Sequence, residues 1–181
     1  MVDRQLKDLM TMKFKIENQK IGLTGTITAN IGLIYNIEND KDNRIFINPY
    51  GKDRHQKAID SEDEEHLTVW DKATGNIIGF IILAGLENQN LSLEFRRIII
   101  QNKGKGFGRL CLQLTKEYCF MKLRFHRLWL DVFDDNERAI NLYKSEGLQI
   151  DGHLREVVRQ GDNYRSLILL SILENEYKQR H

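Results

Sequence analysis

The sequence contains a single proline, two cysteines and no long apolar segment, and each of these scarcities limits what the protein can be. No apolar run approaches the roughly 18 residues that a membrane-spanning helix needs, and the N-terminal segment is too polar for a signal peptide. No low-complexity tract, internal repeat or linker divides the chain. The formal net charge is +1, so bulk charge predicts neither a nucleic-acid partner nor a membrane partner. These features predict one globular domain over residues 1–181, located in the cytoplasm.

The two cysteines, Cys111 and Cys119, fall in one helical pattern. They stand eight residues apart, which is about 12 Å along a helix axis. A disulfide cannot bridge that separation. We therefore expect two reduced thiols in the core of a cytoplasmic protein.

Hydrophobic periodicity indicates both strands and helices along the chain. We expect a strand pair within residues 13–26, short helices over 29–36 and 52–59, a hairpin between 67 and 83, and strands over 91–100 and 127–133. Further helices should follow the glycine-rich stretch and cover residues 134–147, and a second hairpin should lie between 154 and 173. The charged run SEDEE (residues 61–65) is expected to form a solvated turn. This order predicts a mixed sheet with helices on its faces, and so an α/β (α+β) fold.

Three glycines alternate with other residues between 104 and 108, where a predicted strand gives way to a predicted helix (IIIQNKGKGFGRL, residues 98–110). A helix N-terminus presents free amides and a partial positive charge, and glycines let a bulky anion approach these donors. Lys103, Lys105 and Arg109 add positive charge. The stretch is either a cradle for a pyrophosphate or a tight turn with a basic rim, and the local sequence does not choose between them.

Two familiar nucleotide-binding loops do not fit this spacing. A P-loop needs G-x-x-x-x-G-K-S/T, which is absent from the sequence. A dinucleotide fingerprint needs G-x-G-x-x-G at the first strand of a parallel unit, whereas this chain has G-x-G-x-G after several strands that look antiparallel. A dinucleotide-dependent oxidoreductase is therefore disfavoured.

The stretch QNKGKGFGRL resembles the pyrophosphate loop of the GNAT superfamily of acyl-coenzyme A-dependent N-acetyltransferases, commonly written Arg/Gln-x-x-Gly-x-Gly/Ala. Gln101, Gly104 and Gly106 satisfy this pattern. In the alternative register, Lys103 holds the position before the first glycine, where Arg or Gln is usual. The connection before the loop, IIIQNKG, is shorter than is usual in that family.

A second segment of the chain supports the same resemblance. The stretch NERAINLY follows the loop by about 30 residues and resembles the second cofactor segment of the family, with Asn136 and Tyr143 seven residues apart. The hairpin at residues 152–173 is similar to that of the branch that includes ribosomal-protein N-acetyltransferases and bacterial polyamine acetyltransferases. The resemblance covers about residues 65 to 173.

The resemblance implies a mostly antiparallel sheet in which two neighbouring parallel strands splay apart, with acetyl-CoA as the co-substrate and no metal. The pantetheine arm would pair with free backbone groups in the gap, as an added strand does. These groups would come from Ile98, Ile99 and Ile100. The diphosphate would bind the loop residues Lys103, Gly104, Lys105, Gly106, Phe107, Gly108 and Arg109. Asn136 would contact the pantetheine, or would simply cap its helix.

The resemblance also implies direct transfer of the acetyl group to a primary amine through a tetrahedral intermediate. Tyr143 would protonate the leaving sulfur, since a phenol with a pKa of about 10 stays protonated at neutral pH; its alternative role is a core aromatic. Glu94 is the predicted base, with an ion pair to Arg96 or Arg97 as the alternative, and Asp131 is the second candidate. His126 is expected to be solvent-exposed.

Several alternatives stay open at this point. A non-catalytic acyl-CoA-binding or sensor domain would share the fold and the cofactor. The acceptor amine belongs to a small molecule or to a protein, and polyamines, protein N-termini, amino acids and aminoglycosides all qualify. The acidic run 62–65 would attract a polyamine, but a solvated loop is the favoured explanation. Exposed strands of the last hairpin would allow a homodimer to form.

Overall fold

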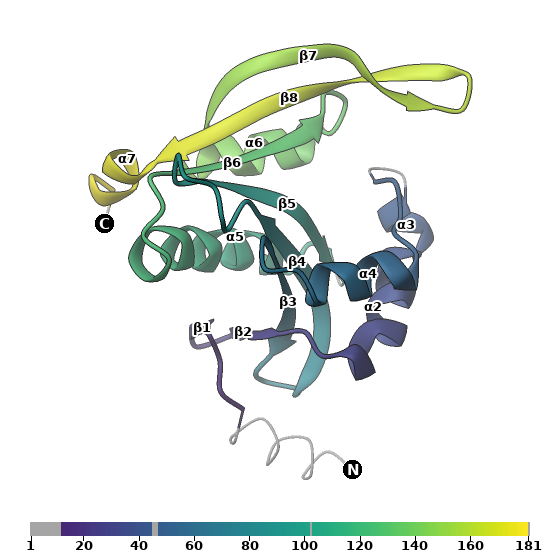
Figure 1. The fold of residues 1–181 in the computed structure, drawn as a ribbon, viewed down its shortest axis with the longest axis vertical. Helices are drawn as coiled ribbons and strands as arrows, with labels where there is room; N and C mark the ends of the chain where they lie inside the picture. The colour runs from purple at the N-terminus through teal and green to yellow at the C-terminus, as the bar shows by residue number, and fades with distance from the viewer. Residues whose placement is uncertain (1–11, 45–46, 102, 181) are drawn as a thin grey trace.

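The computed structural model describes residues 12–44, 47–101 and 103–180 (Figure 1). Within these ranges, eight strands form one sheet in the order β1-β2-β3-β4-β5-β6-β8-β7. Neighbouring strands run antiparallel except for β5 and β6, which are parallel. The predicted mixed, mostly antiparallel α/β fold is confirmed.

The strands and helices follow the predicted order closely. The strands are β1 (Ile16–Glu17), β2 (Ile21–Gly25), β3 (Glu64–Asp71), β4 (Asn76–Ala84), β5 (Ser92–Ile100), β6 (Arg127–Phe133), β7 (Gln149–Gln160) and β8 (Asn163–Leu173). The helices are η1 (Thr28–Asn30), α2 (Ile31–Glu38), α3 (Lys41–Arg44), α4 (Lys52–Ile59), α5 (Phe107–Glu117), η2 (Tyr118–Lys122), α6 (Glu137–Ser145) and α7 (Glu174–Lys178). The predicted helix at 52–59 and the strand at 127–133 have the expected bounds.

The sheet buries side chains on both faces, with α5 and α6 on one side and α2 and α4 on the other (Figure 1). Along β4, Ile81 and Leu83 belong to a larger core that also takes in residues of α5 and α6. Phe80 and Ile82 belong to a smaller core shared with Ile34 and other residues of α2. This double burial explains why β4 reads as a nearly continuous apolar run rather than as an alternating one.

An extra residue in β5 opens the sheet at its centre. Ala84 of β4 pairs with Glu94, whereas Ile82 pairs with Arg97, so β5 carries one residue more than β4 between these pairs. A bulge of this kind bends its strand. On the other side, β5 pairs with β6 only from Ser92 to Glu94, while β6 continues beside β8 as far as Phe133. The two parallel strands therefore splay, as the resemblance implied.

The prediction that residues 61–65 form a solvated turn is wrong for the last two of them. Residues 61–63 do form a turn, but Glu64 and Glu65 begin β3, and the side chain of each is only 12% exposed. Glu64 forms ion pairs with Arg54 and Arg96, and Glu65 forms one with Lys15. These partners come from other elements, so the carboxylates are neutralised inside the fold rather than by water.

The cysteines behave as predicted. Cys111 and Cys119 are buried and free, and burial raises the pKa of both thiols. They are therefore unreactive core residues. In the part of the chain that the structure describes, no helix is long and apolar enough to cross a lipid bilayer.

Two glycine-to-alanine substitutions should have opposite effects on stability. A Cβ at Gly79 of β4 would lie 2.2 Å from the Ile99 carbonyl oxygen and 2.7 Å from Ile100 Cδ1, so Gly79→Ala should destabilise the fold by about 1–3 kcal/mol. Gly32 lies inside α2 with no atom within 4 Å of the added Cβ, and Gly32→Ala should stabilise by about 0.5–1 kcal/mol. Urea midpoints measure both. An unchanged midpoint for Gly79→Ala would contradict the close approach of β4 and β5.

Candidate active site

The three glycines of the loop do not serve the same purpose. Gly104 and Gly106 have φ angles of 90° and 80°, a conformation that favours glycine, and Gly106 is the N-cap of α5. Gly108 already lies in α5, where an added Cβ would meet only Leu142 of α6, at an ordinary 3.9 Å. Backbone geometry therefore requires the first two glycines and not the third.

The loop offers free donors at the start of α5. No oxygen of a described residue accepts a hydrogen bond from the amides of residues 106–109, and the first amide to be bonded is that of Leu110, to Gly106 O at 3.2 Å. An added Cβ at Gly104 or Gly106 would meet nothing within 4 Å, so the surface there is open. Free amides at the N-terminus of an 11-residue helix attract an anion. This geometry fits the predicted diphosphate.

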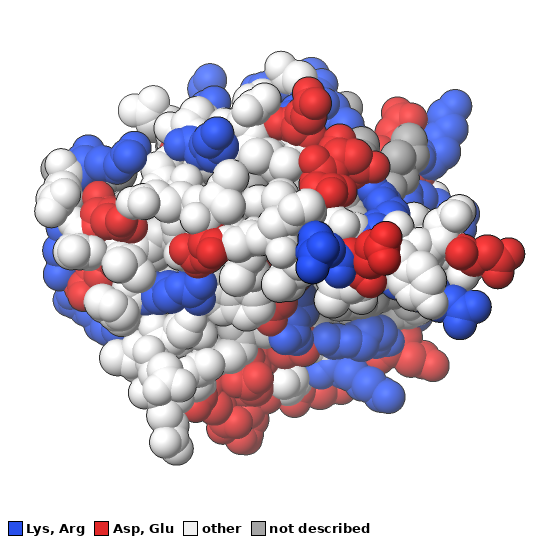
Figure 2. All heavy atoms as spheres, turned by 90° about the horizontal axis from the view of Figure 1, so that it is seen from above, with Lys and Arg blue, Asp and Glu red and all other residues white. Residues whose placement is uncertain are grey.

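Two of the three basic side chains of the loop have partners within the fold. Lys103 donates to the backbone oxygen of Asp42, and Arg109 forms an ion pair with Glu146. Lys105 makes no hydrogen bond or ion pair with any residue that the structure describes. Elsewhere, Lys and Arg side chains lie next to Asp and Glu side chains over the face shown in Figure 2. Of the three basic side chains of the loop, only Arg109 is neutralised by a carboxylate of a described residue, so the loop keeps a positive charge.

Glu146 joins α5 to the end of α6. Its carboxylate accepts from Lys116 Nζ at 3.1 Å and its carbonyl accepts from the same nitrogen at 2.7 Å, in a buried contact. Desolvation favours the protonated acid, but hydrogen bonds from Lys116 and Arg109 outweigh it and hold the pKa of Glu146 below its ordinary value. The contact fixes the helix that bears the loop against the helix that bears Tyr143.

The central part of β5 has an open edge. The residues Ile98, Ile99 and Ile100 pair with β4, but the described strand pairing with β6 has ended at Glu94. Their side chains are packed: Ile99 lies in the smaller core, and Ile98 and Ile100 pack against the larger one. Buried side chains and an open backbone edge therefore coexist in this part of β5.

Tyr143 lies in α6, within the larger core and only 8% exposed. Its hydroxyl makes no hydrogen bond to a described residue. Burial, and then the charge of Asp131, raise the pKa of Tyr143 to about 12. The phenol is thus protonated at neutral pH and free to donate.

Asn136 caps α6, as one of its two predicted roles requires. Its side-chain oxygen accepts from the amide of Ala139 at 3.3 Å. Its side-chain NH₂ group has no partner in the described ranges, so the residue keeps donors for a ligand.

Glu94 is held in a chain of ion pairs. Its Oε2 accepts from Arg96 Nη2 at 2.6 Å and from Arg96 Nε at 3.0 Å. Arg96 also contacts Glu64, which Arg54 binds through both Nη atoms at 2.6 and 2.8 Å. Desolvation lowers the pKa of Arg96, but Glu94 and Glu64 raise it by more. The predicted alternative role of Glu94, an ion pair with Arg96, is present.

Sequence reasoning missed a buried polar chain that starts at Glu38. This fully buried carboxylate pairs with Arg97, accepts from the Tyr50 amide at 2.7 Å and lies 3.1 Å from His55 Nε2. His55 Nδ1 lies 3.0 Å from Nε2 of His66. No local motif marks these residues, because they come from α2, α4, β3 and β5.

The hydrogen bonds of this chain continue from Glu38 to Thr26. A carboxylate that is ion-paired with Arg97 accepts, so His55 Nε2 donates to Glu38. His66 Nδ1 lies 2.9 Å from the Thr26 hydroxyl, and the direction of this bond and of the one between the two histidines depends on their tautomers. Burial, and then His55, lower the pKa of His66 to about 3, so this ring stays neutral. The chain fixes α2 and α4 against the sheet beside the opening.

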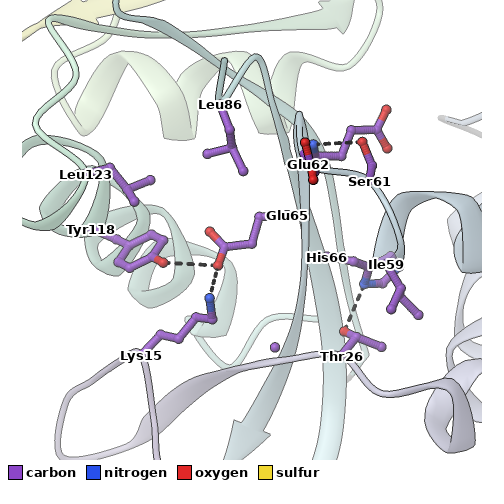
Figure 3. Close-up of a pocket in the computed structure, with 12 residues that line it drawn as sticks. Lys15, Thr26, Ile59, Ser61, Glu62, Glu65, His66, Leu86, Tyr118 and Leu123 are labelled. Atoms are coloured by element: carbon purple, nitrogen blue, oxygen red, sulfur yellow. Dashed lines mark hydrogen bonds and ion pairs between the residues drawn. The ribbon is translucent and has the colours of Figure 1, made fainter. Parts of the chain in front are cut away.

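A cavity of about 380 Å³ lies elsewhere, beside β3 (Figure 3). Its lining includes Lys15, Glu65 and Tyr118, and Glu65 Oε1 accepts from the Tyr118 hydroxyl at 3.1 Å. Oε2 of Glu65 is buried with no hydrogen-bond partner among the described residues. None of the predicted catalytic or cofactor-binding residues lines this cavity, but Glu62, Glu64 and Glu65 of the acidic run do.

An open strand edge beside a helix N-terminus with free amides is the arrangement expected of a transferase whose extended donor carries a diphosphate. The chain belongs to the Acetyltransferase (GNAT) family, which matches residues 33–148. It is an acetyl-CoA-dependent N-acetyltransferase. Among the functions that the sequence left open, this excludes the oxidoreductase and the non-catalytic domain.

The similar proteins include polyamine acetyltransferases. Spermidine N(1)-acetyltransferase of Vibrio cholerae is 28% identical over 90% of this chain and 98% of its own length. The Escherichia coli enzyme of the same name is 28% identical over 71% and 69%. A structure of the V. cholerae enzyme with CoA and spermine superposes with a TM-score of 0.79 and 27% identity, covering 89% of this chain and 99% of that one. A dodecameric structure of that enzyme gives a TM-score of 0.76 and 29% identity, covering 90% and 99%.

Gly106→Ala should weaken coenzyme A binding. A left-handed conformation costs a non-glycine residue roughly 1–2 kcal/mol, so the loop should shift and the affinity should fall about tenfold. Gly161→Ala is the matched control, since Gly161 also has a positive φ, of 63°, but lies in the β7–β8 turn. Titration calorimetry with coenzyme A measures both. Equal affinity for the two variants would contradict a role for the loop in binding.

Proposed function

We propose that the protein transfers the acetyl group of acetyl-CoA to a polyamine. The similarity to spermidine acetyltransferases over most of the chain supports this acceptor. The structure of this chain supports the same acceptor, because a group of carboxylates lies near the opening between β5 and β6. Glu94 belongs to the last pair between β5 and β6, Asp131 lies two residues beyond that pair on β6, and Glu64 forms an ion pair with Arg96 of β5. An acceptor with several ammonium groups suits such a site.

The donor would bind along β5 and at the loop. Free backbone groups of Ile98, Ile99 and Ile100 would pair with its pantetheine arm, and Asn136 would donate a hydrogen bond from its side-chain amide. The amides of residues 103–109 would hold the diphosphate, with Lys105 as the available cation. This arrangement uses only groups that the fold leaves without partners among the described residues.

The same groups would assist the transfer. Acetyl-CoA supplies the acetyl group as a thioester. A free amide of β5 would donate to the carbonyl oxygen as that atom gains negative charge. The Tyr143 hydroxyl would give its proton to the departing sulfur. Tyr143 carries this proposal, because it is a buried, protonated phenol without a hydrogen-bond partner in the described chain.

Glu94 would contribute to acceptor binding through its charge. It is also the base predicted from the sequence, but Arg96 holds one of its oxygens with two hydrogen bonds. A polyamine entering the opening would compete with Arg96 and Arg54 for Glu94 and Glu64. Binding should therefore weaken as salt concentration rises.

We also propose that residues 1–181 act as a single domain in the cytoplasm and assemble into a homo-oligomer. The single sheet and the two free, buried thiols support the first part. The β7–β8 hairpin projects from the rest of the fold (Figure 1) and supports the second. It exposes apolar side chains, with Ile150 at 51%, Leu154 at 42%, Val157 at 54% and Tyr164 at 58% exposed.

Replacing an apolar side chain of the hairpin should weaken this assembly. Val157→Lys puts a charge on β7, the edge strand of the sheet, and should shift the sedimentation coefficient toward that of a smaller species. Met121→Lys is the control, because Met121 is also exposed, at 43%, but lies on η2. An unchanged coefficient for Val157→Lys would exclude the hairpin as the contact.

Tyr143→Phe should lower kcat by about 100-fold or more, the usual contribution of a general acid. Stability and coenzyme A affinity should stay unchanged, since the hydroxyl has no described partner to lose. Thiol release with spermidine and a panel of other amines measures the rate. Tyr118→Phe, which removes the hydrogen bond to Glu65, should leave kcat unaltered. A Tyr143→Phe enzyme with wild-type kcat would refute the proton-donor assignment.

A further inference from the structure

The transfer needs a group that removes a proton from the acceptor, because amines are mostly protonated at neutral pH. We propose that this group is Asp131, and that Glu94 instead holds Arg96 in place. The inference rests on the proposed transfer to an amine, but not on that amine being a polyamine.

The position of Asp131 follows from the strand register. The last pair between β5 and β6 joins Glu94 to Trp129, and Asp131 lies two residues further along β6, where the strands have separated. Leu128 and Leu130 of β6 point into the larger core, so Trp129 and Asp131 lie on the opposite face. Asp131 thus lies at the start of the opening, and its side chain is exposed.

Asp131 is the carboxylate of this site that lacks a counter-ion. Glu94 is bound by Arg96, and Glu64 is bound by Arg96 and Arg54. Asp131 makes no side-chain hydrogen bond or ion pair with any residue in the described ranges. A carboxylate held by a guanidinium is a poorer proton acceptor, because the ion pair stabilises its charged form. Asp131 is free of that restraint.

The groups that face Asp131 favour its role as a base. Desolvation, and then the charge of Glu94, raise its pKa, while Arg96 opposes them. Solvent reaches this side chain, yet enough protein surrounds it for desolvation to dominate. The charge of Asp131 also acts on Tyr143 of α6, which lies in the larger core on the other face of the sheet. The base and the acid would therefore reach the opening from opposite faces of the sheet.

The proton balance of the reaction is complete with these two residues. Asp131 takes one proton from the ammonium, which leaves a neutral amine, and releases it to the solvent that it contacts. The amine nitrogen forms a bond to the carbonyl carbon, and the bond from that carbon to sulfur breaks. Tyr143 gives its proton to the sulfur and regains one from the nitrogen. One proton of the ammonium thus replaces that of Tyr143, and one reaches water.

The experiment compares Asp131→Asn with Glu94→Gln in thiol-release assays on the best acceptor of an amine panel. Asp131→Asn should lower kcat/KM by about 100-fold or more near pH 7. It should recover activity as the pH rises, because a larger fraction of the amine is then already neutral. Glu94→Gln should mainly raise KM. Asp162→Asn, in the β7–β8 turn, is the matched control for loss of one negative charge.

Coenzyme A titration of each variant shows whether the donor site is still folded, so that the loss of a base can be distinguished from misfolding. Asp131→Glu should restore part of the rate that Asp131→Asn loses. A wild-type enzyme that is active on other amines but not on polyamines would overturn the proposed acceptor and leave Asp131 open to the same test. Near-normal kcat/KM in Asp131→Asn, with a large and pH-rescued loss in Glu94→Gln, would overturn the inference and return the base to Glu94.

Discussion

One extra residue in β5 shapes the active site of this protein. The bulge opposite Ile82 and Ala84 bends β5, and its pairing with β6 ends at Glu94. A strand in the middle of a sheet normally has both edges bonded, so this opening exposes polar backbone that needs a partner. The side chains of Ile98 to Ile100 remain packed against the two cores. The backbone edge is thereby left open without loss of the core.

The other site residues are arranged around this opening. The glycine loop continues from β5 and ends in the free amides of α5. The buried contact between Lys116 and Glu146 fixes α5 against the end of α6, which bears Tyr143. On the opposite face, the buried chain from Glu38 to His66 holds α2 and α4 against the sheet. Rigid elements on both faces therefore support the proposed donor and acceptor sites.

Much of this could be predicted from short stretches of sequence. The glycine loop, the apolar strand at 127–133 and the cap at Asn136 each carry a local signal, and the structure has each where the signal placed it. What could not be predicted depends on register or on distant partners. The run at 61–65 reads as solvated until Arg54 and Arg96 are seen beside Glu64. The histidine chain joins four separate elements, and the bulge is visible only once β4 and β5 are paired.

The central claim is that the open edge of β5 and the loop amides hold the donor. Amide hydrogen exchange, followed residue by residue with and without coenzyme A, tests it most directly. Bound coenzyme A should slow exchange at residues 98–100 and 106–109 and leave the projecting strand β7 unchanged. If coenzyme A binds but those amides exchange as fast as in the free protein, the donor lies elsewhere and the account is wrong.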